Sequence, residues 1–199
     1  MAGETDSGIN HGREAILRTL REGRVRFVLI GGAALESHQQ PHRTEDIDIT
    51  PDREHENLER LAEVLNGLEC RMEIDPNDAD SAIELPGDYF TAASLARVTI
   101  WNLRTAHGKL DLAVAPAGFP NGYTQLAPGA QTARVFATRV EVAIASLDDV
   151  EHSKRVAGRP KDRRYLERVG RLDPPQRARE SVTRDRDYGH EDELEPPSR

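Results

Sequence analysis

Cysteine is almost missing from this chain, since Cys70 is the only one among 199 residues. A single cysteine excludes an internal disulfide and any metal cage built from several thiolates. Long apolar runs are missing too, because no segment approaches the roughly 20 apolar residues that a membrane-spanning helix requires. The first residues also lack the basic-then-apolar pattern of a signal peptide. These absences predict a cytoplasmic protein that has no membrane partner.

An excess of positive charge is missing as well. The chain has 27 Lys and Arg against 35 Asp and Glu, which gives a formal net charge of −8. Proteins that coat nucleic acid without specificity rely on dense Lys and Arg, so the composition argues against that class. An acidic protein still binds a nucleotide when a metal ion supplies the positive charge.

The length suits one well-buried domain and is too short for two large ones. We predict a flexible N-terminus over residues 1–10, one folded domain over 11–170 and a disordered charged tail over 171–199. The tail contains four of the twelve prolines and few residues that a core would bury, which is typical of disorder.

Strand-like and helix-like segments together predict an α+β (mixed α/β) domain, with a small twisted mixed sheet and helices packed on it. Strands are expected at residues 26–30, 45–50, 70–74, 97–104, 109–115, 133–137 and 139–145. Helices are expected at residues 11–23, 33–40, from Pro51-Asp52 to about 68, from Ser146 to Gly158, and from Pro160 to about 170.

Asp46 and Asp48 lie two residues apart in one predicted strand, so both side chains leave the same face of the sheet. Neighbouring carboxylates repel each other, and a fold tolerates them best when a divalent cation neutralises their charge. Hard oxygen ligands suit Mg²⁺ or Mn²⁺. The pair therefore predicts a site for one of these metals.

Asp111 is an isolated acid between Leu110 and Leu112 in another strand-like run. A charge in such a strand is costly unless it is paired or bound to a metal. If this strand lies beside the strand of Asp46 and Asp48, the three carboxylates converge. Two metals then clamp the attacking and leaving oxygens of a phosphoryl displacement, with Asp111 as general base. The alternative is an acid at a strand edge that pairs with nearby basic residues.

Gly31 and Gly32 form a glycine pair between a strand and a helix. Glycines at this junction let backbone N–H groups approach a phosphate closely. A lone glycine pair is a weak signal, but it gains weight because an Asp-x-Asp follows on the next strand.

The stretch FVLIGGAALESHQQPHRTEDIDI, residues 27–49, resembles the signature of the DNA polymerase β-type nucleotidyltransferase superfamily. Within it, the pattern of Arg43, Thr44, Asp46 and Asp48 is similar to that of the AbiEii and MenT-like toxins of bacterial toxin–antitoxin systems. The segment SLDDVEHSKRVAGRPKDRRYL, residues 146–166, resembles their basic C-terminal motif. The matching pieces are residues 25–50, 105–114 and 146–166, which cover about a third of the expected domain.

This resemblance implies the nucleotidyltransferase fold and transfer of a nucleoside monophosphate from a nucleoside triphosphate to an acceptor hydroxyl, with release of pyrophosphate. It implies that Asp46, Asp48 and Asp111 hold Mg²⁺ or Mn²⁺ and that Lys154 is a catalytic phosphate contact. The implied acceptor is tRNA, and the implied partner is a cognate antitoxin. The expected nucleotide-binding residues are Gly31, Gly32, Arg43, Thr44, Arg159, Lys161 and Asp162.

Several alternatives stay open at this stage. Thr44 serves equally well as a residue that shapes its loop, and Lys154 as a surface lysine paired with Glu151. The acceptor is alternatively a small hydroxylated molecule such as an aminoglycoside. A non-catalytic binding module on the same fold is the third interpretation of the chain.

Overall fold

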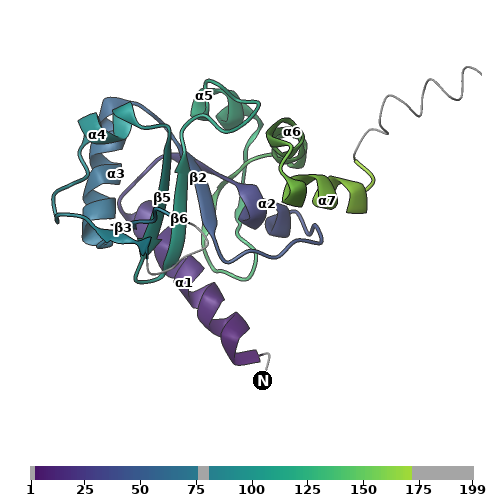
Figure 1. Cartoon of the computed structure of the whole chain (residues 1–199), viewed down its shortest axis with the longest axis horizontal. Coiled ribbons are helices and arrows are strands. Elements are labelled where there is room, and N and C mark those ends of the chain that lie inside the picture. Colours follow the sequence, from purple (N-terminus) through teal and green to yellow (C-terminus); the bar gives the residue numbers. More distant parts are fainter. Residues whose placement is uncertain (1–2, 76–80, 172–199) are drawn as a thin grey trace, which may run out of the picture.

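The computed structural model describes residues 3–75 and 81–171 (Figure 1). These residues form an eight-stranded mixed sheet in the order β4-β3-β5-β6-β2-β1-β8-β7. Two neighbouring pairs are parallel, β1 with β8 and β2 with β6, and the other pairs are antiparallel. The α+β class is therefore confirmed. The strands are β1 Phe27–Ile30, β2 Ile47–Pro51, β3 Arg71–Met72, β4 Ile83–Glu84, β5 Ile100–Thr105, β6 Gly108–Ala113, β7 Gln131–Arg134 and β8 Glu141–Ile144.

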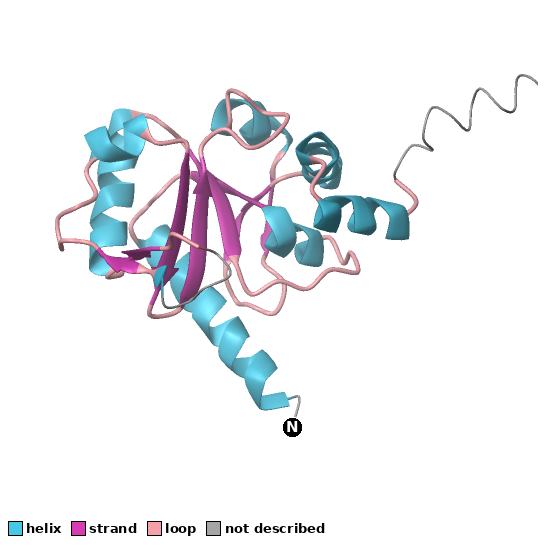
Figure 2. Ribbon diagram, in the orientation of Figure 1, coloured by secondary structure: helices cyan, strands magenta, loops and turns pink. Residues whose placement is uncertain are grey.

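Helices surround the central strands (Figure 2). In the view of Figure 1, α3 and α4 lie to one side of these strands and α2, α6 and α7 to the other. Among the described residues, no helix is both long enough and apolar enough to cross a lipid bilayer. The helices are α1 Gly3–Glu22, α2 Gly31–Ser37, α3 His55–Gly67, α4 Ala92–Arg97, α5 Tyr123–Leu126, α6 Leu147–Ala157 and α7 Pro160–Arg168, with a short 3₁₀ helix η2 at Ala127–Gly129.

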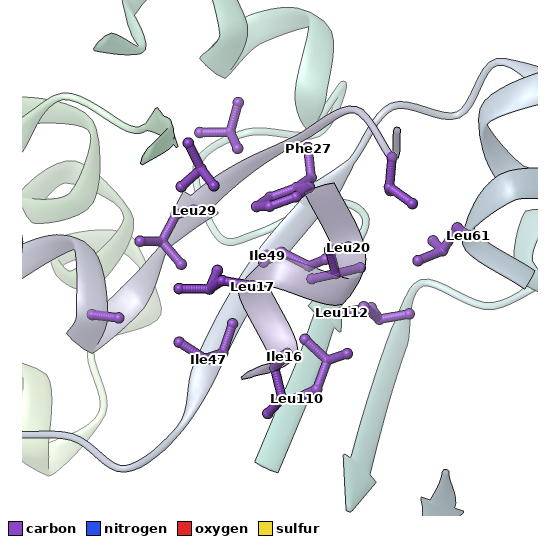
Figure 3. Close-up of a cluster of buried hydrophobic side chains, with 14 of the residues drawn as sticks. Ile16, Leu17, Leu20, Phe27, Leu29, Ile47, Ile49, Leu61, Leu110 and Leu112 are labelled. Carbon is purple, nitrogen blue, oxygen red and sulfur yellow. The ribbon is translucent and has the colours of Figure 1, made fainter. Parts of the chain in front are cut away.

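The main core lies between one face of the sheet and helices α1 and α3 (Figure 3). Side chains alternate between the two faces of a strand, so the apolar residues of β2 and β6 point toward α1 while the residues between them point to the opposite face. The buried core residues of these two strands are Ile47, Ile49, Leu110 and Leu112. The opposite face is left for Asp48 and Asp111.

Helix α1 begins at Gly3, whereas the sequence predicts a helix only from residue 11. The helix passes so close to the β5–β6 turn that a Cβ at Gly12 would lie 2.0 Å from the carbonyl oxygen of His107. Glycine weakens a helix locally, and packing against the sheet outweighs that preference here. Residues 172–199, which include almost all of the predicted tail, lie outside the described residues.

Other boundaries also differ from the prediction. The second strand starts at Ile47, so Asp46 precedes β2 instead of lying inside it. Pro51 ends that strand, and α3 starts only at His55, because residues 52–54 form a turn in which the side chain of Asp52 accepts a hydrogen bond from the backbone N–H of Glu54. The strand predicted at residues 133–137 is β7 at 131–134, since a turn closed by Val135 and Val140 follows it.

Helix α6 begins as its sequence predicts. Ser146 is the N-cap and its hydroxyl accepts a hydrogen bond from the backbone N–H of Asp149, which satisfies one of the free donors at the helix start. Gly158 ends the helix in the left-handed conformation, at φ 60°, as C-terminal glycines commonly do. Helix α7 then starts at Pro160.

Candidate functional site

Strands β2 and β6 are parallel neighbours, and Asp48 is paired in register with Asp111. Residues that face each other across two strands point to the same side of the sheet and lie close together. The condition on which the sequence argument depends, that the two strands are neighbours, is therefore met. Two carboxylates that lie 63 positions apart in the chain meet on the face opposite the main core.

The backbone at Gly31 lies directly against Asp48. Gly31 has a positive φ of 66°, and a Cβ at this position would lie 2.1 Å from the Oδ2 atom of Asp48. The next N–H group, that of Gly32, donates a hydrogen bond to the Asp48 carboxylate. Any side chain at Gly31 would both strain the backbone and displace the carboxylate, so this position requires glycine.

Asp46 is held by a loop that a buried ion pair fixes. The Thr44 hydroxyl accepts a hydrogen bond of 3.2 Å from the backbone N–H of Asp46. The backbone N–H of Thr44 donates to Oε1 of Glu36 at 2.8 Å. Oε2 of Glu36 accepts a bond of 2.7 Å from Arg13, and both side chains are buried. The Thr44 hydroxyl thus shapes its loop, which is one of the two roles that the sequence leaves open.

Burial and mutual repulsion raise the pKa values of the Asp48 and Asp111 carboxyl groups. Burial raises the pKa of Asp48 above its ordinary value, and the charge of Asp46 raises it further. Burial also raises the pKa of Asp111 to about 7, with further contributions from Asp48 and Asp46. The Oδ1 atom of Asp111 is buried and accepts no hydrogen bond from the described residues. A nearby cation would relieve both the repulsion and the unsatisfied oxygen.

The donor set fits a hard cation that arrives with further oxygen ligands. In the part of the chain that the structure describes, no three His, Cys, Asp or Glu side chains are grouped so that they could hold a metal ion. Mg²⁺ usually binds one or two carboxylates and completes its shell with water and substrate phosphates. Asp48 and Asp111 supply such a pair, so the residues fit Mg²⁺ or Mn²⁺ as shared ligands with a nucleotide.

Two cationic side chains are oriented by one buried acid. Nζ of Lys154 lies 2.9 Å from Oδ1 of Asp162, and Nε of Arg159 lies 2.6 Å from Oδ2. Burial would raise the pKa of Asp162, but hydrogen bonds from Arg159 and Lys154 outweigh this effect and lower the pKa. Lys154 is buried, so it is not the surface lysine paired with Glu151 that the sequence left possible.

These elements surround one cavity of about 800 Å³. Its lining includes every residue expected at the site except Asp162, which is fully buried and anchors Lys154 and Arg159 from behind. The expected residues in the lining are Gly31, Gly32, Arg43, Thr44, Asp46, Asp48, Asp111, Lys154, Arg159 and Lys161.

Sequence analysis missed several residues of this cavity. Arg13 and Glu36 lie on different helices, and no local pattern indicates that they pair. His42 packs against Gly32, where a Cβ would lie 2.8 Å from its Nε2 atom, and burial lowers the pKa of His42. Phe136 is 53% exposed although it is aromatic, and it lines the same cavity. Because the sequence places Phe136 in a predicted strand, its local pattern gives no signal of an exposed aromatic residue at the cavity.

No family model matches the sequence, and comparison with curated proteins finds no match either. The function must therefore be argued from the cavity and the side chains that line it.

Proposed function

We propose that this protein is a metal-dependent nucleotidyltransferase with a nucleotidyltransferase fold. It would move a nucleoside monophosphate from a nucleoside triphosphate to an acceptor hydroxyl. The observation that carries the proposal is the in-register pairing of Asp48 with Asp111 in a cavity that Lys154 and Arg159 also line. Carboxylates for metals and cations for phosphates then line the same space.

The residues divide the reaction between them. The acceptor oxygen bonds to the α-phosphorus while the bond from that phosphorus to the bridging oxygen breaks, and pyrophosphate leaves. Asp111 accepts the proton of the acceptor hydroxyl. Lys154 and Arg159 stabilise the charge that develops on pyrophosphate. Bound Mg²⁺, held by Asp48 and Asp111 together with oxygens of the nucleotide, would supply additional charge neutralisation.

Asp162 and Gly31 support these groups without touching the reacting atoms. Asp162 fixes two cations through short ion pairs, so their ammonium and guanidinium groups need little reorganisation during transfer. Gly31 lets the backbone approach the Asp48 carboxylate closely.

The lining favours an anionic acceptor over a polycationic aminoglycoside. Once metal ions neutralise the aspartates, the basic side chains of the lining outnumber its remaining acids, Glu36 and Glu45, and the cavity would repel an aminoglycoside and attract a polynucleotide. We therefore propose an RNA acceptor such as tRNA, and a role as the toxin of a toxin–antitoxin pair. The basic residues of the lining are Arg13, Arg43, Lys109, Lys154, Arg159 and Lys161.

The test is incubation of the protein with labelled nucleoside triphosphates, Mg²⁺ and total RNA, with Asp46→Ala as the control. We expect labelled RNA and released pyrophosphate only with the unmodified protein. Equal labelling by both proteins would end the proposal. Drug resistance without growth arrest on expression would instead select a small-molecule acceptor.

A further inference from the structure

A second cavity, of about 270 Å³, adjoins the first. The two cavities share four lining residues, which are Gly31, Asp48, Lys154 and Arg159. In the proposed function these four residues bind phosphates or the metals that accompany them. The second cavity thus begins where the phosphate groups would lie.

Small apolar side chains keep this second cavity open. Alanines come from three separate parts of the chain, namely the end of β6 with the loop after it, the end of β8 and the last turn of α6. Phe119 forms one wall and packs edge-on against His152, with ring centroids 5.4 Å apart. Ile100 also lines this cavity and is 60% exposed. The alanines of the lining are Ala113, Ala115, Ala117, Ala145 and Ala157.

Polar groups enter this lining mainly from one helix. Asp149 and Ser153 of α6 both line the cavity and lie four residues apart, so they share one helix face. Asp149 is held in place, because the hydroxyl of Ser146 donates to its Oδ2 atom at 2.7 Å. A fixed carboxylate accepts hydrogen bonds from amino groups but has no donor for a carbonyl.

We propose that this second cavity binds the nucleobase of the donor nucleotide, and that Asp149 selects bases that carry an exocyclic amino group over uracil. The proposal rests on the proposed function, since the shared residues hold the phosphates of the same molecule. A planar base suits an apolar pocket that has few, well-placed polar groups. Uracil would present a carbonyl where cytosine presents an amino group, and a carbonyl would leave the Asp149 carboxylate without a donor.

The first experiment measures binding of CTP and of inorganic tripolyphosphate, each with Mg²⁺, by calorimetry. Ala157→Leu and Ala115→Leu fill the cavity from α6 and from the loop after β6. We expect each to weaken CTP binding by about tenfold or more, because overfilling a packed site is costly. Tripolyphosphate, which has no base, should bind as it does to the unmodified protein. Ala93→Leu, the same change at an exposed position of α4, should alter neither.

Each outcome has a definite meaning. If the unmodified protein binds neither ligand, the proposed function fails and the nucleobase site fails with it. If it binds both and the two cavity-filling variants bind CTP normally, only the nucleobase site is wrong. Equal weakening of both ligands would also overturn the site, because the cavity would then serve the phosphates. Weakened RNA binding with normal CTP binding would assign the cavity to the acceptor and overturn the proposal.

The second experiment compares CTP with UTP. The unmodified protein should bind CTP about tenfold more tightly than UTP, as expected for one charged hydrogen bond. Asp149→Asn, whose amide donates to a carbonyl, should reduce or reverse this preference while tripolyphosphate binding stays unchanged. Equal binding of CTP and UTP by the unmodified protein would refute the role of Asp149.

Discussion

Replacing Asp111 by asparagine should stabilise the protein at alkaline pH while it abolishes nucleotide transfer. Folding raises the pKa of this carboxyl from 3.8 to about 7, mainly through burial and then through the charge of Asp48. Between these two values the folded protein binds a proton that the unfolded chain releases. Stability therefore falls as the pH rises from about 4 to 7, and the full penalty is present above pH 7.

The size of the penalty follows from the pKa. A difference of about three pH units corresponds to roughly 4 kcal/mol, at about 1.4 kcal/mol for each unit. The Asp111 residue is partly exposed to solvent, and water screens the interactions of its charge. We therefore expect about half of this value, near 2 kcal/mol. An asparagine at this position would keep the shape of the side chain without the charge. Asp111→Asn should thus gain about 2 kcal/mol at pH 8 and much less at pH 4, where the carboxyl of the unmodified protein is already protonated.

Urea unfolding at pH 4 and pH 8, with and without Mg²⁺, measures these differences. Mg²⁺ should stabilise the unmodified protein at pH 8 because it binds only the folded state, and it should stabilise Asp111→Asn less. The matched control is Asp88→Asn, which removes an exposed carboxylate outside the cavity and should change stability little at either pH. A loss of stability in Asp111→Asn at pH 8, or an equal change at both pH values, would refute the account of two repelling carboxylates.

The remaining predictions concern residues that hold the site in place. Asp162→Asn leaves Lys154 buried without its ionic partner, so we expect a loss of about 3 kcal/mol in urea unfolding and a higher KM for the nucleotide. Arg13→Met leaves Glu36 buried and uncompensated, and should cost about 3 kcal/mol, seen as a lower thermal midpoint. Gly31→Ala forces a Cβ into contact with a carboxylate at a positive φ and should cost about 1–3 kcal/mol, with weaker Mg²⁺ binding in calorimetry.

Each of these variants has a control of the same chemistry. Asp148→Asn and Arg18→Met remove exposed charges from α6 and α1, and both should leave stability nearly unchanged. Gly87→Ala adds a methyl group where nothing lies within 4 Å. If Asp162→Asn raises the KM no more than Asp148→Asn does, Asp162 does not orient the phosphate-binding cations. If the thermal midpoint of Arg13→Met matches that of Arg18→Met, the role of Arg13 is contradicted. The role of Gly31 is contradicted if the thermal midpoint of Gly31→Ala matches that of Gly87→Ala.

Local sequence patterns were sufficient for the ends of some elements and for the face that Asp48 and Asp111 occupy. Helix α6 begins after Ser146 and ends at Gly158 as expected, since capping depends on residues within one turn of the helix. The alternation of acids with isoleucine and leucine predicts which side chains are buried, because the repeat of a strand is two. The close contact between Gly12 and the turn at His107 could not be predicted, because it joins residues that lie far apart in the chain.

By itself, the sequence determined that three aspartates stand apart from the core and that glycine and basic motifs accompany them. Only the tertiary structure decided that β6 lies beside β2 with Asp48 opposite Asp111, that Asp162 is buried beneath two cations, and that a second cavity opens behind them. The physical reason is that a strand encodes its own two faces through near neighbours. Its partner strand, by contrast, is chosen by the packing of the whole sheet against its helices.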